Sequence, residues 1–412
     1  MFNGWGESWT LGTLASNGTD TVFEYSPQAL KRGIEFSPVH LKLRAEALSG
    51  FLDHQAFLPG LVADALPDGW GLLLMDKLFL KAGRDLAQVT SLDRLGFVGS
   101  RAMGALAFKP ADMLVRAHET ADDDLSLLEL AKATADVVED KETTALKLLA
   151  VVGGSPHGAR PKAVVQYDEA TGMVSTREDA AGAAWLVKFP AQHEHKEVCA
   201  IEYAYSVLAR ECGFDMPKTR YFDLTKNMAA FGVARFDRQD GMRVPVHSFA
   251  GALNANFRLP SLDYQTVLRA TRVFTRDEVE VEKAFSRCVL NVILNNRDDH
   301  AKNFSFRMNS HMQWKLSPVY DLTFNTGPRG EHQTAVMGES RNPGRADLLK
   351  LAADCSVRAA SAVEAIDKVC SGVSRLATFL VDFEIRKTTS KTIVDAVGLN
   401  IKRCSASSES SR

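Results

Sequence analysis

The sequence predicts an α+β protein in which a β-rich N-terminal half precedes a largely helical C-terminal half. Most segments that alternate apolar and polar residues with a period of two fall before residue 236, whereas the longest segment with apolar residues at helical spacing follows it. The length of 412 residues allows two or three subdomains at about 150 residues each. With 45% apolar residues, the chain can bury a large core, so a disordered protein is excluded.

Charge and cysteine usage narrow the class of protein further. A net charge of −2 argues against bulk electrostatic binding to nucleic acid, because proteins that rely on phosphate contacts carry a basic excess. The 6 cysteines form no C-x-x-C pair, which disfavours zinc ribbons and redox motifs. The chain has no apolar run of about 18 residues and no basic start typical of a signal peptide, so we expect a cytoplasmic protein without a membrane span.

The N-terminal part is predicted to form short strands and turns before the first helices. An Asn17-Gly18 turn between alternating segments predicts a hairpin, and an apolar run of helical length follows the segment Leu-Pro-Asp-Gly-Trp-Gly at 66–71. The predicted segments are, in order, strands at 9–14, 22–25 and 33–38, a helix at 72–80, a glycine-punctuated apolar stretch at 99–108 and a helix within 123–140.

In the middle and at the end of the chain, proline and glycine mark the ends of strands and helices more clearly. Pro190 stops one strand, and Gly213 is a candidate C-cap after a helix. The predicted segments are strands at 163–167 and 184–189, a helix at 197–212, a strand at 228–235, a long helix at 277–296 and a mostly helical remainder.

A densely polar loop follows the long helix, and its spacing points to phosphoryl transfer. Asp298 and Asn303 have the Asp-x-x-x-x-Asn spacing of protein-kinase catalytic loops. In such loops the Asp accepts the proton of the substrate hydroxyl, and the Asn oxygen reaches a magnesium ion on the phosphates. Taken alone, the motif is more often a capped surface loop, because short motifs match by accident.

A second acid follows where kinases place a metal ligand. Residues 304–306 alternate like a strand, and the extended segment 314–320 ends at Asp321. One or two carboxylates together with phosphate oxygens suit the octahedral geometry of Mg²⁺. No Phe-Gly follows Asp321, so a turn-forming aspartate is the alternative.

Upstream, a strand lysine and a glycine-rich loop supply groups suited to phosphates. Lys188 stands in an otherwise apolar strand, where it either faces solvent or pairs with ATP phosphates. Glu202 on the next helix is a candidate ion-pair partner and Glu197 competes with it, although either could be an ordinary exposed helix residue. The loop from Gly153 to Gly158 precedes this strand, and its backbone N–H groups could approach phosphate oxygens.

The order of these parts carries more weight than any one of them. The parts follow one another in the order found in protein kinases. They are a glycine loop, a strand lysine, a helix glutamate, a hinge-like strand end, a long helix, Asp-x-x-x-x-Asn and a final Asp. This order predicts a bilobal, protein-kinase-like fold that transfers a phosphoryl group. Other chemistries are disfavoured, since His193 and His195 lack a third zinc ligand and Ser155 lacks the elbow of a hydrolase nucleophile.

On these motifs, the chain resembles the HipA-type serine/threonine kinases of bacterial toxin–antitoxin systems over about residues 5–390. The segments that carry the resemblance are the catalytic loop at 298–305, the metal segment at 317–322, the phosphate loop at 155–162, the Arg-Phe-Asp-Arg motif at 235–238, and the N-terminal segments 66–71 and 99–108. Ala234, Asp299 and the pair His247-Ser248 depart from the residues usual in that family.

The resemblance implies a role for each candidate residue, with ATP and magnesium as cofactors. Asp298 is the implied catalytic base, Asn303 and Asp321 are the implied metal ligands, and Ser155 is an implied autophosphorylation site. The implied nucleotide-binding residues are Gly153, Gly154, Ser155, His157, Gly158, Ala159, Lys162, Lys188, Glu202, Val233, Ala234, Arg235, Phe236, His300 and Lys302.

The resemblance also implies an organisation and a function. The implied parts are a HipA N-terminal subdomain at 1–110, the rest of the kinase N-lobe at 111–235, a helical C-lobe at 236–402 and a disordered tail at 403–412. The implied function is that of a toxin that phosphorylates a serine or threonine of a protein target, such as an aminoacyl-tRNA synthetase. A small, HipB-like DNA-binding antitoxin is the implied partner, and DNA would be contacted mainly through it.

Two alternatives stay open at this point. One is a non-catalytic kinase-fold protein that binds an antitoxin in transcriptional regulation. The other is a small-molecule kinase, because the same Asp and Asn serve the phosphorylation of alcohols in general.

Overall fold

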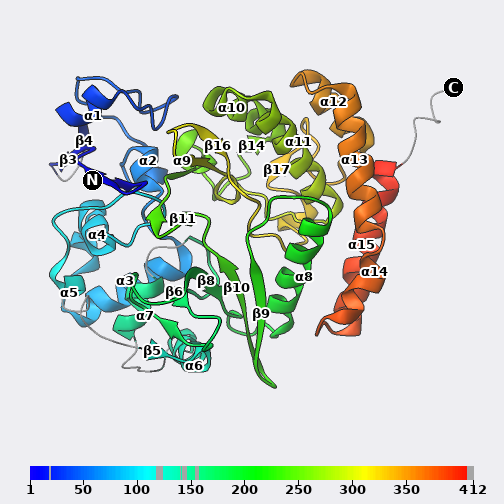
Figure 1. The fold of residues 1–412 in the computed structure, drawn as a ribbon, viewed down its shortest axis with the longest axis horizontal. Helices are drawn as coiled ribbons and strands as arrows, with labels where there is room; N and C mark the ends of the chain where they lie inside the picture. The colour runs from blue at the N-terminus through cyan, green and yellow to red at the C-terminus, as the bar shows by residue number, and fades with distance from the viewer. Residues whose placement is uncertain (18–19, 117–123, 140, 142–145, 154–156, 406–412) are drawn as a thin grey trace. The chain divides into compact units, whose positions relative to one another are not determined.

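The computed structural model describes residues 1–17, 20–116, 124–139, 141, 146–153 and 157–405, and it divides into two compact units (Figure 1). The first unit comprises Met1–Cys199, Lys218–His247 and Met308–Met312, and the second comprises Ala200–Pro217, Ser248–Arg307 and Gln313–Arg412. The first unit holds the large β-sheet and the second is mainly helical. The predicted α+β class, with one β-rich and one helical lobe, is therefore confirmed.

The first unit is built around a six-stranded antiparallel sheet. Its strand order is β5-β7-β6-β8-β10-β9, and each neighbouring pair is antiparallel. The strands are β5 (Asp124–Leu125), β6 (Lys162–Tyr167), β7 (Val174–Ser175), β8 (Ala183–Lys188), β9 (Thr219–Thr225) and β10 (Met228–Ala234). The three strands predicted at 163–167, 184–189 and 228–235 are thus confirmed. The burial of β6 and β8 partly alternates with the period of a strand, whereas β10, which lies between β8 and β9, is buried along most of its length.

The N-terminal part of this unit consists of two hairpins and short helices. β1 (Phe2–Gly4) pairs with β2 (Glu7–Trp9), and β3 (Gly12–Ser16) pairs with β4 (Thr21–Tyr25). This confirms the predicted hairpin, although the predicted strand 9–14 is split between β2 and β3. The strand predicted at 33–38 is wrong, because α1 (Pro27–Arg32) ends at a left-handed Gly33 and the following residues form an isolated bridge without a partner strand.

Helices on the first unit complete its core. They are α2 (Gly60–Ala63), α3 (Gly69–Lys81), α4 (Ser91–Val98), α5 (Met113–Arg116), α6 (Leu127–Val138) and α7 (Leu146–Gly153). α7 contacts both α3 and β6, and Trp70, Leu74 and Phe79 on α3 are buried in the core that these elements share. The two predicted helices of this region are confirmed, since their apolar residues form one buried face.

A buried ion pair ties the end of the sheet to the segment 99–108. The guanidinium of Arg235 donates to Asp237 from Nε over 2.8 Å and from Nη2 over 2.7 Å, and the backbone N–H of Gly104 donates to Asp237 over 2.7 Å. Burial alone would raise the pKa of Asp237, but the charges of Arg235 and Arg238 and these hydrogen bonds hold that pKa well below its ordinary value. The Arg-Phe-Asp-Arg motif therefore anchors the first unit from within.

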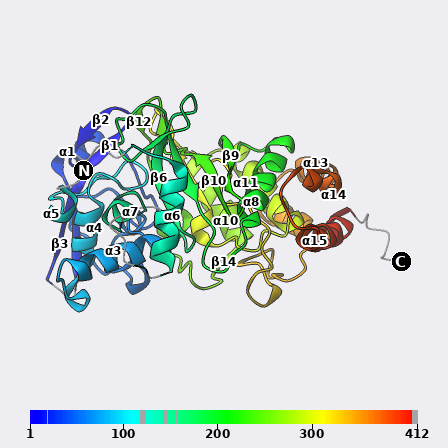
Figure 2. The ribbon, with the colours of Figure 1, turned by 90° about the horizontal axis from the view of Figure 1, so that it is seen from below.

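The second unit is an assembly of helices (Figure 2). α11 contacts α10, α13 and α15, while α12, α13 and α15 contact one another. The helices are α9 (Phe249–Ala252), α10 (Tyr264–Thr275), α11 (Glu278–Ile293), α12 (Arg345–Asp354), α13 (Ala359–Val373), α14 (Leu376–Phe379) and α15 (Lys387–Ser405), together with most of α8 (Glu197–Glu211). The short strands β14 (Leu262–Asp263), β15 (Ser305–Met308), β16 (Trp314–Leu316) and β17 (Thr334–Ala335) lie between these helices in the chain.

The central helix α11 begins and ends at residues that satisfy its backbone. Asp277 caps its start by accepting the backbone N–H of Val279 over 3.0 Å. After its end, Asn295 adopts a φ of 55°, a left-handed conformation that asparagine tolerates. Asn400 of α15 donates to the carbonyl of Val292 over 3.0 Å, which satisfies one of the last carbonyls of the helix. The predicted helix is confirmed, and the polar loop follows it directly.

The C-terminus differs from its prediction at one point. α15 continues to Ser405, so the first residues of the predicted tail 403–412 are helical, because they extend a face that buries Cys404. Residues 406–412 lie outside the described residues. Among the helices that the structure describes, none is long and apolar enough to cross a membrane.

Candidate active site

The predicted site residues fall into two sets, one in each unit. In the second unit, the catalytic-loop segment follows α11 and is closed by its own hydrogen bond. Asn303 donates its side-chain amide to the backbone carbonyl of Asp298 over 2.6 Å. Because a carbonyl can only accept, Nδ2 is the donor and Oδ1 is the atom left to face a cation. The side chain of Asp298 is 39% exposed, so an acceptor can reach the carboxylate.

His300 and Lys302 shape this loop. Nδ1 of His300 accepts the backbone N–H of Lys302 over 3.2 Å, and Nε2 lies 4.0 Å from Oδ1 of Asp298. The ammonium of Lys302 lies 4.0 Å from the centre of the Phe257 ring, a cation–π contact. His300 therefore caps the short 3-10 helix Ala301–Asn303, and the nucleotide contacts of both residues stay predictions.

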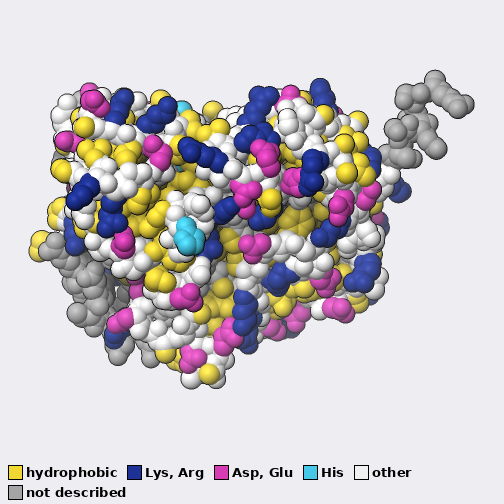
Figure 3. All heavy atoms as spheres, turned by 45° about the horizontal axis from the view of Figure 1, so that its top comes forward, with side chains coloured by type: hydrophobic (Ala, Val, Ile, Leu, Met, Phe, Trp, Pro, Cys, Tyr) yellow, Lys and Arg dark blue, Asp and Glu magenta, His cyan; other side chains and the backbone are white. Residues whose placement is uncertain are grey.

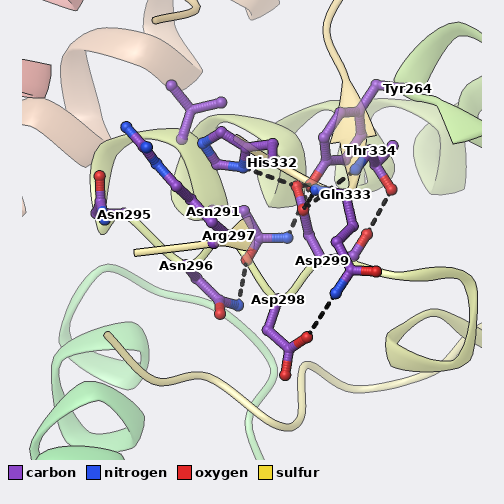
Figure 4. Close-up of polar contacts among 12 residues, drawn as sticks. Tyr264, Asn291, Asn295, Asn296, Arg297, Asp298, Asp299, His332, Gln333 and Thr334 are labelled. Atoms are coloured by element: carbon purple, nitrogen blue, oxygen red, sulfur yellow. Dashed lines mark hydrogen bonds and ion pairs between the residues drawn. The ribbon is translucent and has the colours of Figure 1, made fainter. Parts of the chain in front are cut away.

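A polar network around Asp299 was not predicted from the sequence (Figure 4). Asp299 is fully buried and accepts from the hydroxyl of Tyr264 over 2.9 Å, from Nδ1 of His332 over 2.9 Å and from the backbone N–H of Gln333 over 2.8 Å. Burial, and then the charge of Asp299, raise the pKa of Tyr264 well above its ordinary value, so its hydroxyl keeps the proton that it donates. Gln333 in turn donates its side-chain amide to Oδ1 of Asp298 over 2.8 Å.

The sequence held one weak signal for this network. Asp299 is an acid directly beside the predicted base, and a buried carboxylate requires donors. Those donors lie 33 to 35 residues away in the chain, at Tyr264 before Asp299 and at residues 332–334 after it. Parallel pairing of β14 with β17 brings this segment to the loop, and local spacing does not predict such pairing.

Asp321 lies on a segment that is tied to the same loop. Its φ of 55° is left-handed, a strained conformation that proteins often retain at functional sites. The hydroxyl of Tyr320 donates to the carbonyl of Lys302 over 2.7 Å, and the buried Arg287 donates to the carbonyl of Ser317. These two bonds hold the segment before Asp321, which suits a metal ligand because a ligand must be fixed in position.

In the first unit, the two predicted phosphate-binding lysines occupy opposite positions on adjacent strands. Lys162 of β6 and Lys188 of β8 are direct cross-strand partners, so both side chains leave the same face of the sheet. They are only 4% and 7% exposed. Two ammonium groups on one face of the sheet would both attract an anionic ligand placed there. The ammonium of Lys162 also donates to the carbonyl of His157, within the glycine loop.

The Leu-Pro-Asp-Gly-Trp-Gly segment holds the glycine loop. The carboxylate of Asp68 accepts the backbone N–H of Gly158, and the backbone N–H of Trp70 donates to the carbonyl of Gly158 over 3.1 Å. Between them, Gly69 has a φ of +43°, and a Cβ on it would lie 2.7 Å from Cα of Ala159. Only glycine permits this approach of two backbones, so the N-terminal segment and the glycine loop form one packed structure.

The other predicted loop residues are described only in part. Gly153 ends α7 and is buried, and Ala159 is exposed. Nε2 of His157 lies 2.9 Å from the carbonyl oxygen of Leu66. Gly154 and Ser155 lie outside the described residues. The predicted autophosphorylation of Ser155 therefore stays a prediction.

The predicted hinge residues end strand β10. Val233 and Ala234 lie in this strand, and the backbone N–H groups of Ala234 and Arg235 donate to carbonyls of neighbouring segments over 2.8 and 2.9 Å. The side chain of Arg235 is taken up by its buried ion pair. A nucleotide base would therefore need other backbone atoms of this segment, and the contacts predicted for Val233 to Phe236 stay predictions.

Both candidate glutamates of α8 are buried. Glu197 and Glu202 are each 3% exposed, so neither is the exposed helix residue that was the alternative. Glu197 belongs to the first unit and Glu202 to the second. Which of them pairs with Lys188 stays a prediction.

The donor set fits magnesium and a nucleotide. Among the described residues, no three His, Cys, Asp or Glu side chains gather into a metal-binding cluster. One amide oxygen from Asn303 and one carboxylate from Asp321 suit Mg²⁺, which usually takes its other ligands from phosphates and water. The paired lysines of the first unit suit the phosphates themselves.

Three side chains in the first unit are hydrogen-bonded in the order Asp-His-Ser of a hydrolase site, but the serine is buried. Nδ1 of His247 lies 2.6 Å from Oδ2 of Asp64, and Nε2 lies 3.1 Å from Oγ of Ser37. Ser37 is 1% exposed and His247 is fully buried. No substrate reaches such a serine, so this triad joins distant segments of the unit instead of serving hydrolysis.

The fold and the polar loop together define a protein of the kinase-like α+β class with an added N-terminal module. A model described as the HipA N-terminal domain matches residues 4–109, and a model described as the HipA-like C-terminal domain matches residues 154–377. The chain belongs to the HipA family.

Similar proteins agree with this membership. A chain in the solved complex of HipA, HipB and operator DNA from Shewanella oneidensis MR-1 matches with a TM-score of 0.70 at 17% identity, over 96% of this chain and 94% of that chain, which shows the fold. "Putative kinase Y4dM" of Sinorhizobium fredii is 27% identical over 44% of this chain and 47% of that protein. A "Putative kinase" of Haemophilus influenzae is 26% identical over 32% of this chain and 43% of that protein. The chain spans about half the length of the curated relatives that it matches.

Proposed function

We propose that this chain is an ATP- and magnesium-dependent serine/threonine protein kinase that acts as the toxin of a HipBA-like toxin–antitoxin pair. One observation carries the proposal: the amide of Asn303 is bonded to the backbone of Asp298, and a second amide holds the carboxylate of Asp298. A base and a metal ligand in one short, braced loop are what phosphoryl transfer to a hydroxyl requires. Membership of the HipA family and the kinase names of the relatives support it.

Each residue then has a defined task. Asp298 accepts the proton of the acceptor hydroxyl while the oxygen of that hydroxyl attacks the γ-phosphorus of ATP. The bond from the γ-phosphorus to the β–γ bridging oxygen breaks, and ADP is the leaving group. Lys188 and Lys162 bind phosphate oxygens through their ammonium groups. Asn303 through Oδ1 and Asp321 through its carboxylate would hold magnesium, which supplies neutralising positive charge when bound.

A small DNA-binding antitoxin is the proposed partner. The Shewanella chain is seen with HipB and operator DNA, and this chain shares its fold. On the face shown in Figure 3, basic and acidic side chains are interspersed, and the net charge is −2. Such a surface suits contact with DNA chiefly through a partner, because direct binding to phosphates favours a basic field. The proposed target is a serine or threonine of a protein such as an aminoacyl-tRNA synthetase.

Transfer of label from radiolabelled ATP tests the proposed function. We expect label in the chain itself or in a protein of a bacterial extract, and none in a panel of sugars and choline. Loss of self-labelling in Ser155→Ala would assign the autophosphorylation site. Label only in a small molecule would identify a small-molecule kinase, and no transfer to any acceptor would favour the non-catalytic alternative.

Magnesium dependence is expected to respond to Asp321. Asp321→Asn removes the carboxylate but keeps a side chain that tolerates φ of 55°, so the backbone should persist. We expect the magnesium concentration for half-maximal transfer to rise by about tenfold or more, the usual effect of weakening a metal site. Binding of Mn²⁺, followed by electron paramagnetic resonance, gives a readout independent of activity. The control is Asp240→Asn, since Asp240 is also left-handed, with φ of 51°, and exposed; an equal effect in both variants would contradict the assignment.

ATP affinity is expected to depend on Gly69. Gly69→Ala places a Cβ 2.7 Å from the glycine-loop backbone, and overpacking of this kind costs about 1–3 kcal/mol. We expect ATP to bind about tenfold more weakly, as measured by displacement of a fluorescent nucleotide. Gly83→Ala is the control, because Gly83 has a φ of +77° but no atom within 4 Å of an added Cβ. Equal ATP affinity in the two variants would show that the segment does not support the loop.

A further inference from the structure

The carboxylate of Asp299 fixes a distant segment of chain beside the catalytic loop. It is fully buried, and its Oδ1 accepts the backbone N–H groups of Gln333 over 2.8 Å and of Thr334 over 3.2 Å. Its Oδ2 accepts from Tyr264 and from His332, each over 2.9 Å. Four donors on one buried carboxylate define a single arrangement of the segment 332–334, because losing any of them would leave a buried charge poorly solvated.

Further contacts brace the same segment. β17 pairs in parallel with β14, so that Thr334 lies opposite Leu262. The hydroxyl of Thr334 also donates to the backbone carbonyl of Asp299. Behind Tyr264, Nδ2 of Asn291 donates to its hydroxyl over 2.9 Å. The backbone at residue 333 is therefore held from both sides, and Gln333 projects from a rigid base.

From this base, the side chain of Gln333 reaches Asp298. Its Nε2 lies 2.8 Å from Oδ1 of Asp298, and Figure 4 shows the two side chains pointing toward each other. A carboxylate can only accept, so the amide of Gln333 is oriented with its nitrogen toward Asp298. The side chain of Asp298 is 39% exposed, and the bond from Gln333 fixes the position of one of its oxygens. The two adjacent acids are therefore connected through Gln333: Asp299 binds the backbone of Gln333, and the side chain of Gln333 binds the carboxylate of Asp298.

We propose that Gln333 is a positioning residue that orients the carboxylate of Asp298, with Asp299 as its buried anchor. This inference rests on the proposed phosphoryl transfer, in which Asp298 is the base. Its physical basis is that proton transfer requires heavy atoms within about 2.6–3.2 Å in a fixed alignment, and misplacement by about 1 Å costs up to about a hundredfold in rate.

The first arm of the experiment removes only the amide. Gln333→Met keeps the length and most of the volume of the side chain. We expect kcat for phosphoryl transfer to fall by about tenfold to a hundredfold, while the KM for ATP and the thermal unfolding midpoint remain close to those of the wild type. The control is Gln265→Met, which removes a like bond at the surface, from Nε2 of Gln265 to Oδ2 of Asp354 over 2.6 Å, and should leave kcat unchanged.

The second arm of the experiment places a charge beside Asp298 and measures the pH dependence of kcat. A residue with a merely structural role would not change that dependence. Gln333→Glu places a second carboxylate beside Asp298, and two carboxylates at hydrogen-bond distance share a proton. We expect the acid limb of the kcat–pH profile to move to higher pH in this variant and not in Gln265→Glu. The other titratable neighbours, His300 beside Asp298 and His332 bonded to Asp299, are the same in every variant.

The outcomes separate the two claims. If the wild type transfers phosphate, a normal kcat in Gln333→Met or an unmoved acid limb in Gln333→Glu would overturn the positioning role. The proposed function would then still stand. Absence of transfer by the wild type itself would refute the proposed function, and the positioning role with it. A lowered kcat together with a shifted acid limb supports both.

Discussion

Asp298→Asn is expected to reduce phosphoryl transfer by about a thousandfold, within the range of about 10²–10⁴ that one positioned acid–base group contributes. Asparagine has the same shape and can still accept the amide of Gln333, which donates to Oδ1 of Asp298 over 2.8 Å. The backbone carbonyl that binds Asn303 is unchanged. The loop should therefore keep its form and lose its base. Initial rates with radiolabelled ATP and a labelled protein acceptor measure the effect.

Two further measurements make the Asp298 result specific. ATP affinity should stay within about twofold of the wild type, because binding energy and transition-state stabilisation are separate quantities. Asp382→Asn, at an exposed position of the same unit, should leave the rate unchanged. Full activity in Asp298→Asn would contradict the assignment of the base and redirect attention to other acids of the second unit.

Asp237→Asn is expected to lower the free energy of unfolding by about 3–5 kcal/mol, the usual cost of removing one partner from a buried ion pair. The side chains of Arg235 and Asp237 are each 3% exposed, so the variant leaves a buried guanidinium without its counter-ion. Asp237 also accepts the backbone N–H of Gly104. The loss should therefore loosen the segment 99–108 as well as the sheet. Urea unfolding near neutral pH measures it.

The pH dependence of this effect has a definite sign. The folded-state pKa of Asp237 lies below its ordinary value of 3.8, so the pair contributes its stability above that value and loses it as the pH falls toward the folded-state pKa. The difference in unfolding free energy between wild type and Asp237→Asn should therefore shrink as the pH drops below about 3.8.

An exposed ion pair of the same unit provides the control. Asp223 is 48% exposed and lies 2.7 Å from Nζ of Lys196, and such pairs contribute about 0–1 kcal/mol. Asp223→Asn should therefore cost far less than Asp237→Asn. Equal losses in the two variants would show that the buried pair is not the anchor that its geometry indicates.

Most of the fold could be predicted because its signals are local. β6 and β8 follow alternation of period two, β10 is a short continuous apolar run, and α3, α8 and α11 follow apolar residues at helical spacing. The error at 33–38 has a physical reason, since an extended pattern becomes a strand only where a partner offers hydrogen bonds. Gly33 ends α1 in a left-handed turn, and the residues after it form an isolated bridge.

The catalytic and metal-binding groups of the candidate site could be predicted from the sequence. The residues that hold these groups in position could not. Asp298 and Asn303 lie five residues apart, so their proximity follows from the loop itself. The brace from Gln333 could not be read in the same way, because it depends on the pairing of β14 with β17. Arg235 shows the opposite case: its motif suggested a nucleotide contact, whereas its side chain forms a buried ion pair with Asp237.

The amino-acid sequence by itself determined the order of the chemical groups, the strand and helix periods, and the spacing of base and metal ligand within one loop. These features depend on neighbours a few residues apart, which propensity and periodicity govern. Only the tertiary structure decided that Asp299 is a buried anchor, that Gln333 holds Asp298, and that two lysines face one another on paired strands. Such contacts depend on which strands pair and which charges are buried, and these are properties of the packed chain as a whole.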